Sequence, residues 1–67
     1  MYETEDTLTA AQMKIFTNII DDKIGVDYEV NPSASGEPDQ FYCLVIDLET
    51  NAEYKIAQEA EKTALKG

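Results

Sequence analysis

The first regular pattern in the chain is helical. Hydrophobic side chains recur every three or four positions between residues 10 and 24, which is the spacing of an amphipathic helix. Thr9 and Gln12 are three positions apart, as in the capping box that starts many helices. The pattern therefore predicts a helix over residues 10–24, with Phe16 and Ile20 as central core residues.

The middle of the chain has the patterns of two strands. Residues 26–30 alternate between apolar and acidic side chains, so we expect a strand with Asp27 and Glu29 facing water. Residues 31–40 are rich in turn formers and contain both prolines. Residues 41–48 are a nearly continuous run of apolar strand formers, which predicts a central strand paired antiparallel with the first.

The last third of the chain allows two interpretations. Residues 52–57 alternate in polarity and could form a third strand after a tight turn. Alternatively, Thr50 and Glu53 form a second capping box, and the many Ala, Glu, Gln and Lys residues favour one long helix to residue 66. Both interpretations place a helix over residues 58–66.

These elements predict an α+β fold. We expect a small single domain in which the N-terminal helix packs on a two- or three-stranded antiparallel sheet and a C-terminal helix follows, in the order α-β-β-α or α-β-β-β-α. Residues 1–7 are polar and are expected to be a flexible acidic N-terminus, with residues 8–67 as the compact domain. The chain start is acidic, and the longest apolar run, residues 41–46, is far too short to span a bilayer, so we expect a cytoplasmic protein.

Composition excludes most catalytic chemistry. The 67 residues include no His and a single cysteine, Cys43. The usual general base at neutral pH is therefore missing, as are His-containing metal sites, zinc sites with several Cys ligands and any internal disulfide. Cys43 lies in the predicted central strand and is expected to be a buried, unreactive thiol. We expect no enzyme activity, no cofactor and no metal.

Charge supplies the main functional clue. Asp and Glu number 14, Lys numbers 5 and Arg is absent, which gives a formal net charge of -9. Asp21 and Asp22 lie in the last turn of the predicted helix, where the helix dipole disfavours acids, and such violations concentrate at functional sites. Because this helix ends just before the strand with Asp27 and Glu29, we expect the four acids to form one patch. The predicted partner-binding residues are Asp21, Asp22, Asp27, Glu29, Asp47 and Glu49.

An acidic shell of this kind opposes direct binding to nucleic acids or anionic membranes and favours a basic protein surface as partner. In size, acidity and lack of catalytic residues, the chain resembles the small inhibitors that bacteriophages direct against host nucleic-acid enzymes. This resemblance implies a non-enzymatic inhibitor that occupies the basic site of a nucleic-acid-binding enzyme or complex in the host cytoplasm. A phage-encoded DNA mimic of the anti-restriction or anti-CRISPR type is one form of this hypothesis. The alternative is a structural or accessory subunit that docks through an apolar helix face or edge strand, and a homodimer is also open.

Overall fold

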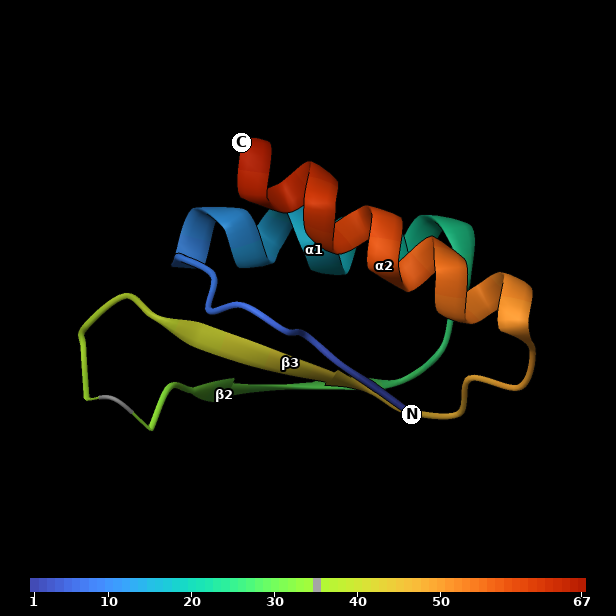
Figure 1. Ribbon diagram of the computed structural model, residues 1–67, viewed down its shortest axis with the longest axis horizontal. Coiled ribbons are helices and arrows are strands. Elements are labelled where there is room, and N and C mark those ends of the chain that lie inside the picture. Colours follow the sequence, from blue (N-terminus) through green and yellow to red (C-terminus); the bar gives the residue numbers. More distant parts are fainter. Residues whose placement is uncertain (35) are drawn as a thin grey trace.

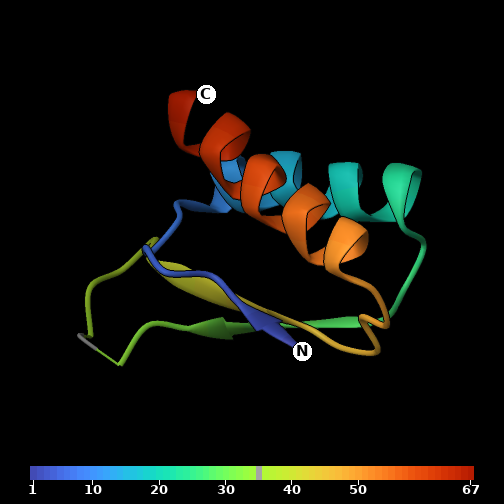
Figure 2. The ribbon, with the colours of Figure 1, turned by 45° about the vertical axis from the view of Figure 1, so that its right-hand side comes forward.

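The computed structural model describes residues 1–34 and 36–67. The elements along the chain are β1 (Tyr2–Glu3), α1 (Ala10–Lys23), β2 (Tyr28–Pro32), β3 (Phe41–Val45) and α2 (Asn51–Lys66). The strands form one antiparallel sheet in the order β1-β3-β2, and both helices lie on the same face of it (Figure 1 and Figure 2). The predicted α+β class is therefore confirmed, with the N-terminal helix packed on a three-stranded sheet.

Helix α1 agrees with its sequence pattern at both ends and in the core. The Thr9 side chain accepts the backbone N–H of Gln12, and the Gln12 side chain accepts the N–H of Thr9, so the capping box is complete. Gly25 has a φ of +75° just past the helix end, a conformation that side chains with a Cβ rarely adopt. Phe16 and Ile20 are fully buried. The predicted positions of both core residues are confirmed.

The last third of the chain forms a single long helix, α2, and not a strand followed by a helix. Thr50 accepts the backbone N–H of Glu53, and the Glu53 carboxylate accepts the N–H of Thr50. The helix then continues to its end at Lys66 and buries Ala57, Ala60 and Ala64, three small residues that let it pack closely on α1. The long helix is confirmed, and a strand over residues 52–57 is excluded.

The third strand comes instead from the start of the chain. Tyr2 pairs with Val45, which makes β3 the central strand of the sheet. Beyond β1, the N–H of Thr4 donates to the carbonyl of Cys43 and the N–H of Cys43 donates to the Thr4 hydroxyl, both at 3.0 Å. The segment that was expected to be a flexible acidic terminus thus contributes a strand and the buried side chain of Tyr2.

A buried acid fastens this segment to α2. The carboxylate of Glu61 accepts hydrogen bonds from the hydroxyl of Tyr2 and from the backbone N–H groups of Glu5 and Asp6, the last two at 3.0 Å. The Tyr2 ring also packs edge-on against Tyr54, with ring centroids 5.2 Å apart. Glu61 is only 4% exposed, so it does not belong to the solvated acidic shell that its sequence context suggested.

Strand β2 starts two residues later than the predicted strand over residues 26–30. Tyr28 pairs with Val45 and Val30 with Cys43, so both lie on the face of the sheet that carries the helices. The acids that alternate with them, Asp27 and Glu29, are exposed as predicted. Val30 nevertheless stays 39% exposed, because β2 is an edge strand and the helices do not cover it fully.

Candidate binding surface

The helices leave one face of the sheet uncovered, and this open sheet face is the candidate binding surface (Figure 1 and Figure 2). Residues on a strand alternate between faces and paired residues share a face, so Cys43, Val45 and their partners face the helices and the residues that alternate with them face outward. The open sheet face consists of Glu3, Asp27, Glu29, Asn31, Tyr42, Leu44 and Ile46.

The open sheet face has an apolar centre between acidic edges. Leu44 on the central strand pairs with Glu3 on one side and Glu29 on the other. Neighbouring strands lie about 4.8 Å apart, so these two acids stand about 10 Å from one another across Leu44. Tyr42 and Leu44 are each partly buried although no helix covers them. A half-buried apolar stripe flanked by carboxylates can bind a partner that offers apolar contacts and positive charge together.

The net charge is divided unequally between the helices and the rest of the chain. All five lysines belong to the helices, where they balance five acids. The lysines are Lys14, Lys23, Lys55, Lys62 and Lys66, and the acids are Asp21, Asp22, Glu53, Glu59 and Glu61. The other nine of the 14 acids lie in the strands and connections, which contain no lysine. The helical layer is therefore neutral by formal charge, and the whole charge of -9 resides on the strands and connections.

The six predicted partner-binding residues fall at three places. Asp27 and Glu29 lie together on the open sheet face, where the carbonyl of Asp27 accepts the N–H of Ile46. Asp21 and Asp22 lie in the last turn of α1, in the helical layer on the other side of the sheet. The structure thus brings together the acids of each pair but separates the two pairs.

Asp21 has a local partner that explains its place at the helix end. The hydroxyl of Tyr28 donates a hydrogen bond to the Asp21 carboxylate at 3.2 Å, joining α1 to β2. Burial, followed by this hydrogen bond, raises the pKa of the Tyr28 hydroxyl, which keeps the donor protonated. The acid that breaks the helix-dipole rule therefore supports the packing of α1 on the edge strand.

Asp47 and Glu49 lie in the connection from β3 to α2. Asp47 is exposed and has a φ of 62°, a left-handed conformation that Asp adopts more readily than most residues. The backbone N–H of Glu49 donates to the Glu53 carboxylate at 3.0 Å, just ahead of the helix. Both residues add negative charge at the end of the molecule where β3 leaves the sheet.

Sequence reasoning missed Glu3, Tyr42, Leu44 and Ile46 as parts of this surface. Tyr42, Leu44 and Ile46 belong to the apolar run that predicts the central strand, and only the placement of both helices on one face leaves their side uncovered. Glu3 could have been found only from the alternation of Tyr2 and Thr4 with the acids Glu3 and Glu5. This strand pattern is too short to recognise by itself.

The remaining chemistry of the described residues is sparse. Within residues 1–34 and 36–67, no three His, Cys, Asp or Glu side chains cluster so as to hold a metal ion. Cys43 is fully buried, and burial raises the pKa of its thiol to about 11, so the thiolate is scarce at neutral pH. No helix in the described part of the chain is both long and apolar enough to cross a bilayer.

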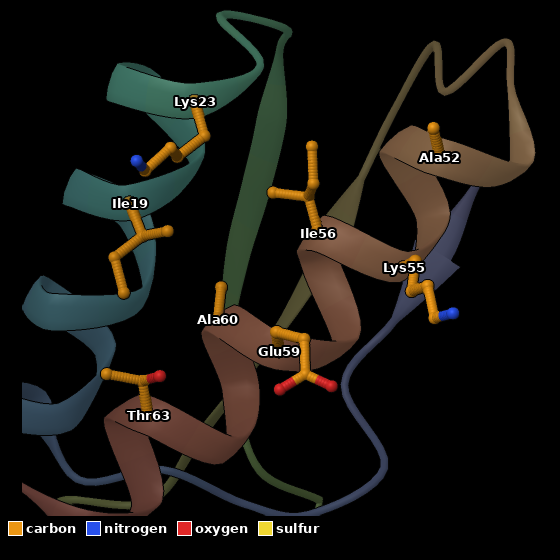
Figure 3. A pocket seen from close by; sticks show the side chains of 8 residues that line it. All are labelled: Ile19, Lys23, Ala52, Lys55, Ile56, Glu59, Ala60 and Thr63. Atoms are coloured by element: carbon orange, nitrogen blue, oxygen red, sulfur yellow. The ribbon is translucent and has the colours of Figure 1, made fainter.

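A second concave feature lies in the helical layer. A groove of about 630 Å³ runs between α1 and α2 and is lined mainly by apolar side chains. Figure 3 shows Ile19 of α1 and Ile56 of α2 facing the space between the helices, with Lys23 and Glu59 at its margins. Its charged lining residues are Lys23, Lys55 and Glu59, so the groove lacks the excess of acids found on the open sheet face.

Comparison with known proteins provides no relative from which to argue. No family model matches the chain, and no curated protein or solved structure is significantly similar to it. A function must therefore be argued from the surfaces described above.

Proposed function

We propose that this protein is a non-enzymatic acidic binding protein that occupies the basic, nucleic-acid-binding surface of another protein. The observation that carries the proposal is the segregation of charge: the strands and connections have nine acids and no lysine, whereas the helices are neutral. Acidity needed only for solubility has no reason to be excluded from balance by lysine in the strands and connections alone. An uneven distribution of negative charge steers a protein onto a positively charged surface.

The open sheet face supplies a plausible contact chemistry for this role. Its carboxylates are held on a rigid sheet, so little conformational entropy is lost when they meet lysine or arginine side chains. Asp27, just before β2, and Glu29 within it lie on the same face about 6.6 Å apart, and Glu3 and Glu29 flank Leu44. In this proposal the carboxylates take the place of phosphates, which makes the protein a mimic of nucleic acid.

The test is displacement of nucleic acid from basic proteins. A panel of basic DNA- and RNA-binding proteins is loaded with a fluorescent oligonucleotide, and release is measured against protein concentration at several salt concentrations. We expect release by at least one member of the panel, weakening steeply as salt rises because exposed charges are screened. Failure to displace oligonucleotide from any member at low salt would contradict the proposal.

Two matched double variants separate the sheet from net charge alone. Asp27→Lys with Glu29→Lys changes the open sheet face, and Asp22→Lys with Glu59→Lys changes the helical layer. Each lysine substituted for an acid adds two charges, so both variants have a net charge of -5. We expect the sheet variant to lose displacement and the helix variant to retain most of it. Equal losses would show that total charge, and not this surface, governs binding.

The groove between the helices favours a second candidate function, that of an accessory subunit that docks through an apolar helix face. It is a mainly apolar surface in the helical layer, away from the open sheet face. Ile56→Asp places a charge in the groove without touching the sheet. If that variant abolishes partner binding, and binding is insensitive to salt, the accessory-subunit function replaces the inhibitor function.

A further inference from the structure

The outer edge of β2 is a ready place for another strand. β2 is the last strand of the sheet, and no strand of the described residues pairs with its far side. Hydrogen bonds from Ile46 N–H to the Asp27 carbonyl and from Ser33 N–H to the Gln40 carbonyl mark the inward-facing positions at both ends of β2. By the alternation of an antiparallel ladder, the N–H and C=O groups of Tyr28 and Val30 point away from β3.

An apolar pocket lies beside this edge, on the face that carries the helices. It has a volume of about 340 Å³ and is formed between α1 and the sheet. Met13 of α1, Tyr28 and Val30 of β2 and Phe41 of β3 contribute apolar lining. Val30 is one of the few large hydrophobic side chains that remain exposed among the described residues. An added strand would cover it.

The two faces of such an added strand would meet different chemistry. Its side chains on the helical side would enter the pocket next to Val30. Its side chains on the other side would lie opposite Asp27 and Glu29, and no lysine is present on any strand. Opposite charges on directly paired strands attract, and like charges repel.

We propose that β2 binds an extended segment of a partner protein by strand addition, and that this segment alternates apolar residues with Lys or Arg. Backbone hydrogen bonds to Tyr28 and Val30 would provide affinity that does not depend on the partner's side chains, and the pocket and the acids would select the alternating side chains. The inference rests on the proposed function for the positive charge of the partner, and it adds how that partner is held.

A second copy of this chain is a poorer occupant of the same edge. Antiparallel pairing of two β2 strands would bring Asp27 and Glu29 of one copy close to the same acids of the other, which destabilises the pair. Pro32 at the end of β2 also lacks an N–H to donate. Charged side chains and proline are common devices against self-association of edge strands.

The experiment uses two synthetic eight-residue peptides of equal composition. One alternates lysine and valine, and the control has four lysines followed by four valines. We expect the alternating peptide to bind the full-length protein about tenfold more tightly, equivalent to about 1.4 kcal/mol. It should also slow hydrogen exchange at the backbone amides of Tyr28 and Val30, measured by NMR. Methylation of alternate peptide nitrogens on the bonding side should abolish binding without any change to the protein.

Each other outcome overturns the inference in a distinguishable way. Equal binding of both peptides, or binding without protection of the Tyr28 and Val30 amides, means that charge alone attracts the peptide; the inference then fails while the proposed function stands. Protection of these amides that rises with protein concentration in the absence of peptide identifies a second copy as the occupant. No binding by either peptide also rejects strand addition, whereas the proposed function fails only if oligonucleotide displacement fails too.

Discussion

Among single residues, Glu61 has a role unlike that of the exposed acids. Its carboxylate accepts three donors from the N-terminal segment, the Tyr2 hydroxyl and the N–H groups of Glu5 and Asp6. A buried acceptor of this kind holds its donors in place, and its removal leaves the buried Tyr2 hydroxyl without this partner. Glu61 therefore belongs to the stability of the fold, not to the binding surface.

We predict that Glu61→Ala lowers the free energy of unfolding by about 2–3 kcal/mol, because hydrogen bonds to a charged group are lost and the buried Tyr2 hydroxyl loses its acceptor. The matched control is Glu59→Ala, two positions earlier on α2. Glu59 is exposed and only approaches Lys62 at 3.8 Å, a pair worth less than about 0.5 kcal/mol. Urea denaturation of both variants measures the difference. Similar small losses in both would mean that Glu61 does not anchor β1.

The buried thiol of Cys43 predicts a pH dependence. Burial raises its pKa from the ordinary 9.0 to about 11, so the unfolded chain loses this proton at lower pH than the folded protein does. The stability contribution is fully present below pH 9 and is lost as pH rises towards 11. We expect the free energy of unfolding to fall between pH 9 and pH 10, and to fall less in Cys43→Ala. The measurement stops at pH 10 because burial also raises the pKa of Tyr2 above its usual value of 10.0. Above that pH, Tyr2 would add a further loss of folding stability. Parallel curves for the two proteins would reject this assignment.

At the level of elements, local signals decide the helices and long-range contacts decide the sheet. Both helices begin at a complete capping box, and each buries a stripe of residues at helical spacing. By contrast, β1 has only two residues and owes its place to pairing with β3 and to the hydrogen bonds of Glu61. A strand this short has no stability of its own.

The capping box of α2 allows a test of how much a local signal contributes to the stability of a helix. We predict that Thr50→Ala lowers the free energy of unfolding by about 1 kcal/mol, because the N–H of Glu53 loses its side-chain acceptor. Thr63→Ala, an exposed position inside the same helix, is the control and should be neutral or slightly stabilising, since alanine has the higher helix propensity. Thermal or urea denaturation distinguishes them. Equal effects would show that the cap contributes nothing beyond propensity.

At the level of the whole molecule, the helices are neutral by formal charge, and the strands and connections have the excess of acids. Two helices with balanced charge cover one face of the sheet, and the nine other acids lie in the strands and connections. Three of these nine, Glu3, Asp27 and Glu29, belong to the open sheet face. The two candidate functions therefore use opposite sides of the molecule, the open sheet face for a basic partner and the groove between α1 and α2 for an apolar one. Variants on one side leave the other unchanged.

The same charge distribution predicts that the isolated protein does not bind nucleic acid. Phosphates are repelled by the acids of the sheet, and the chain has no arginine for bidentate contacts. We expect no shift of duplex DNA or RNA in a gel at low salt, where any electrostatic attraction would be strongest. A shift at micromolar protein would refute the mimicry proposal as well as this prediction.

The sequence by itself determined the features that depend on neighbours close along the chain. The capping boxes at Thr9 and Thr50 fix where the helices start, the alternation around Asp27 and Glu29 fixes which side of β2 meets water, and the apolar run from Phe41 fixes the central strand. Each signal involves residues within a few positions, so periodicity and propensity suffice to recognise it. The class of fold and the acidic character of the surface were predictable for this reason.

Only the tertiary structure decided what depends on residues far apart in the chain. Tyr2 and Glu61 are 59 positions apart, and no local sequence pattern indicates that they form a hydrogen bond. The open sheet face exists because both helices pack on the same side, which leaves Leu44 between Glu3 and Glu29 instead of in a covered core. Asp21 and Glu29, close in sequence, fall on opposite sides of the sheet because successive strand residues face opposite ways and Tyr28 directs its hydroxyl to the helix. Proximity along the chain predicts proximity in space, but the pleat and the layer packing decide which side of the molecule a charge occupies.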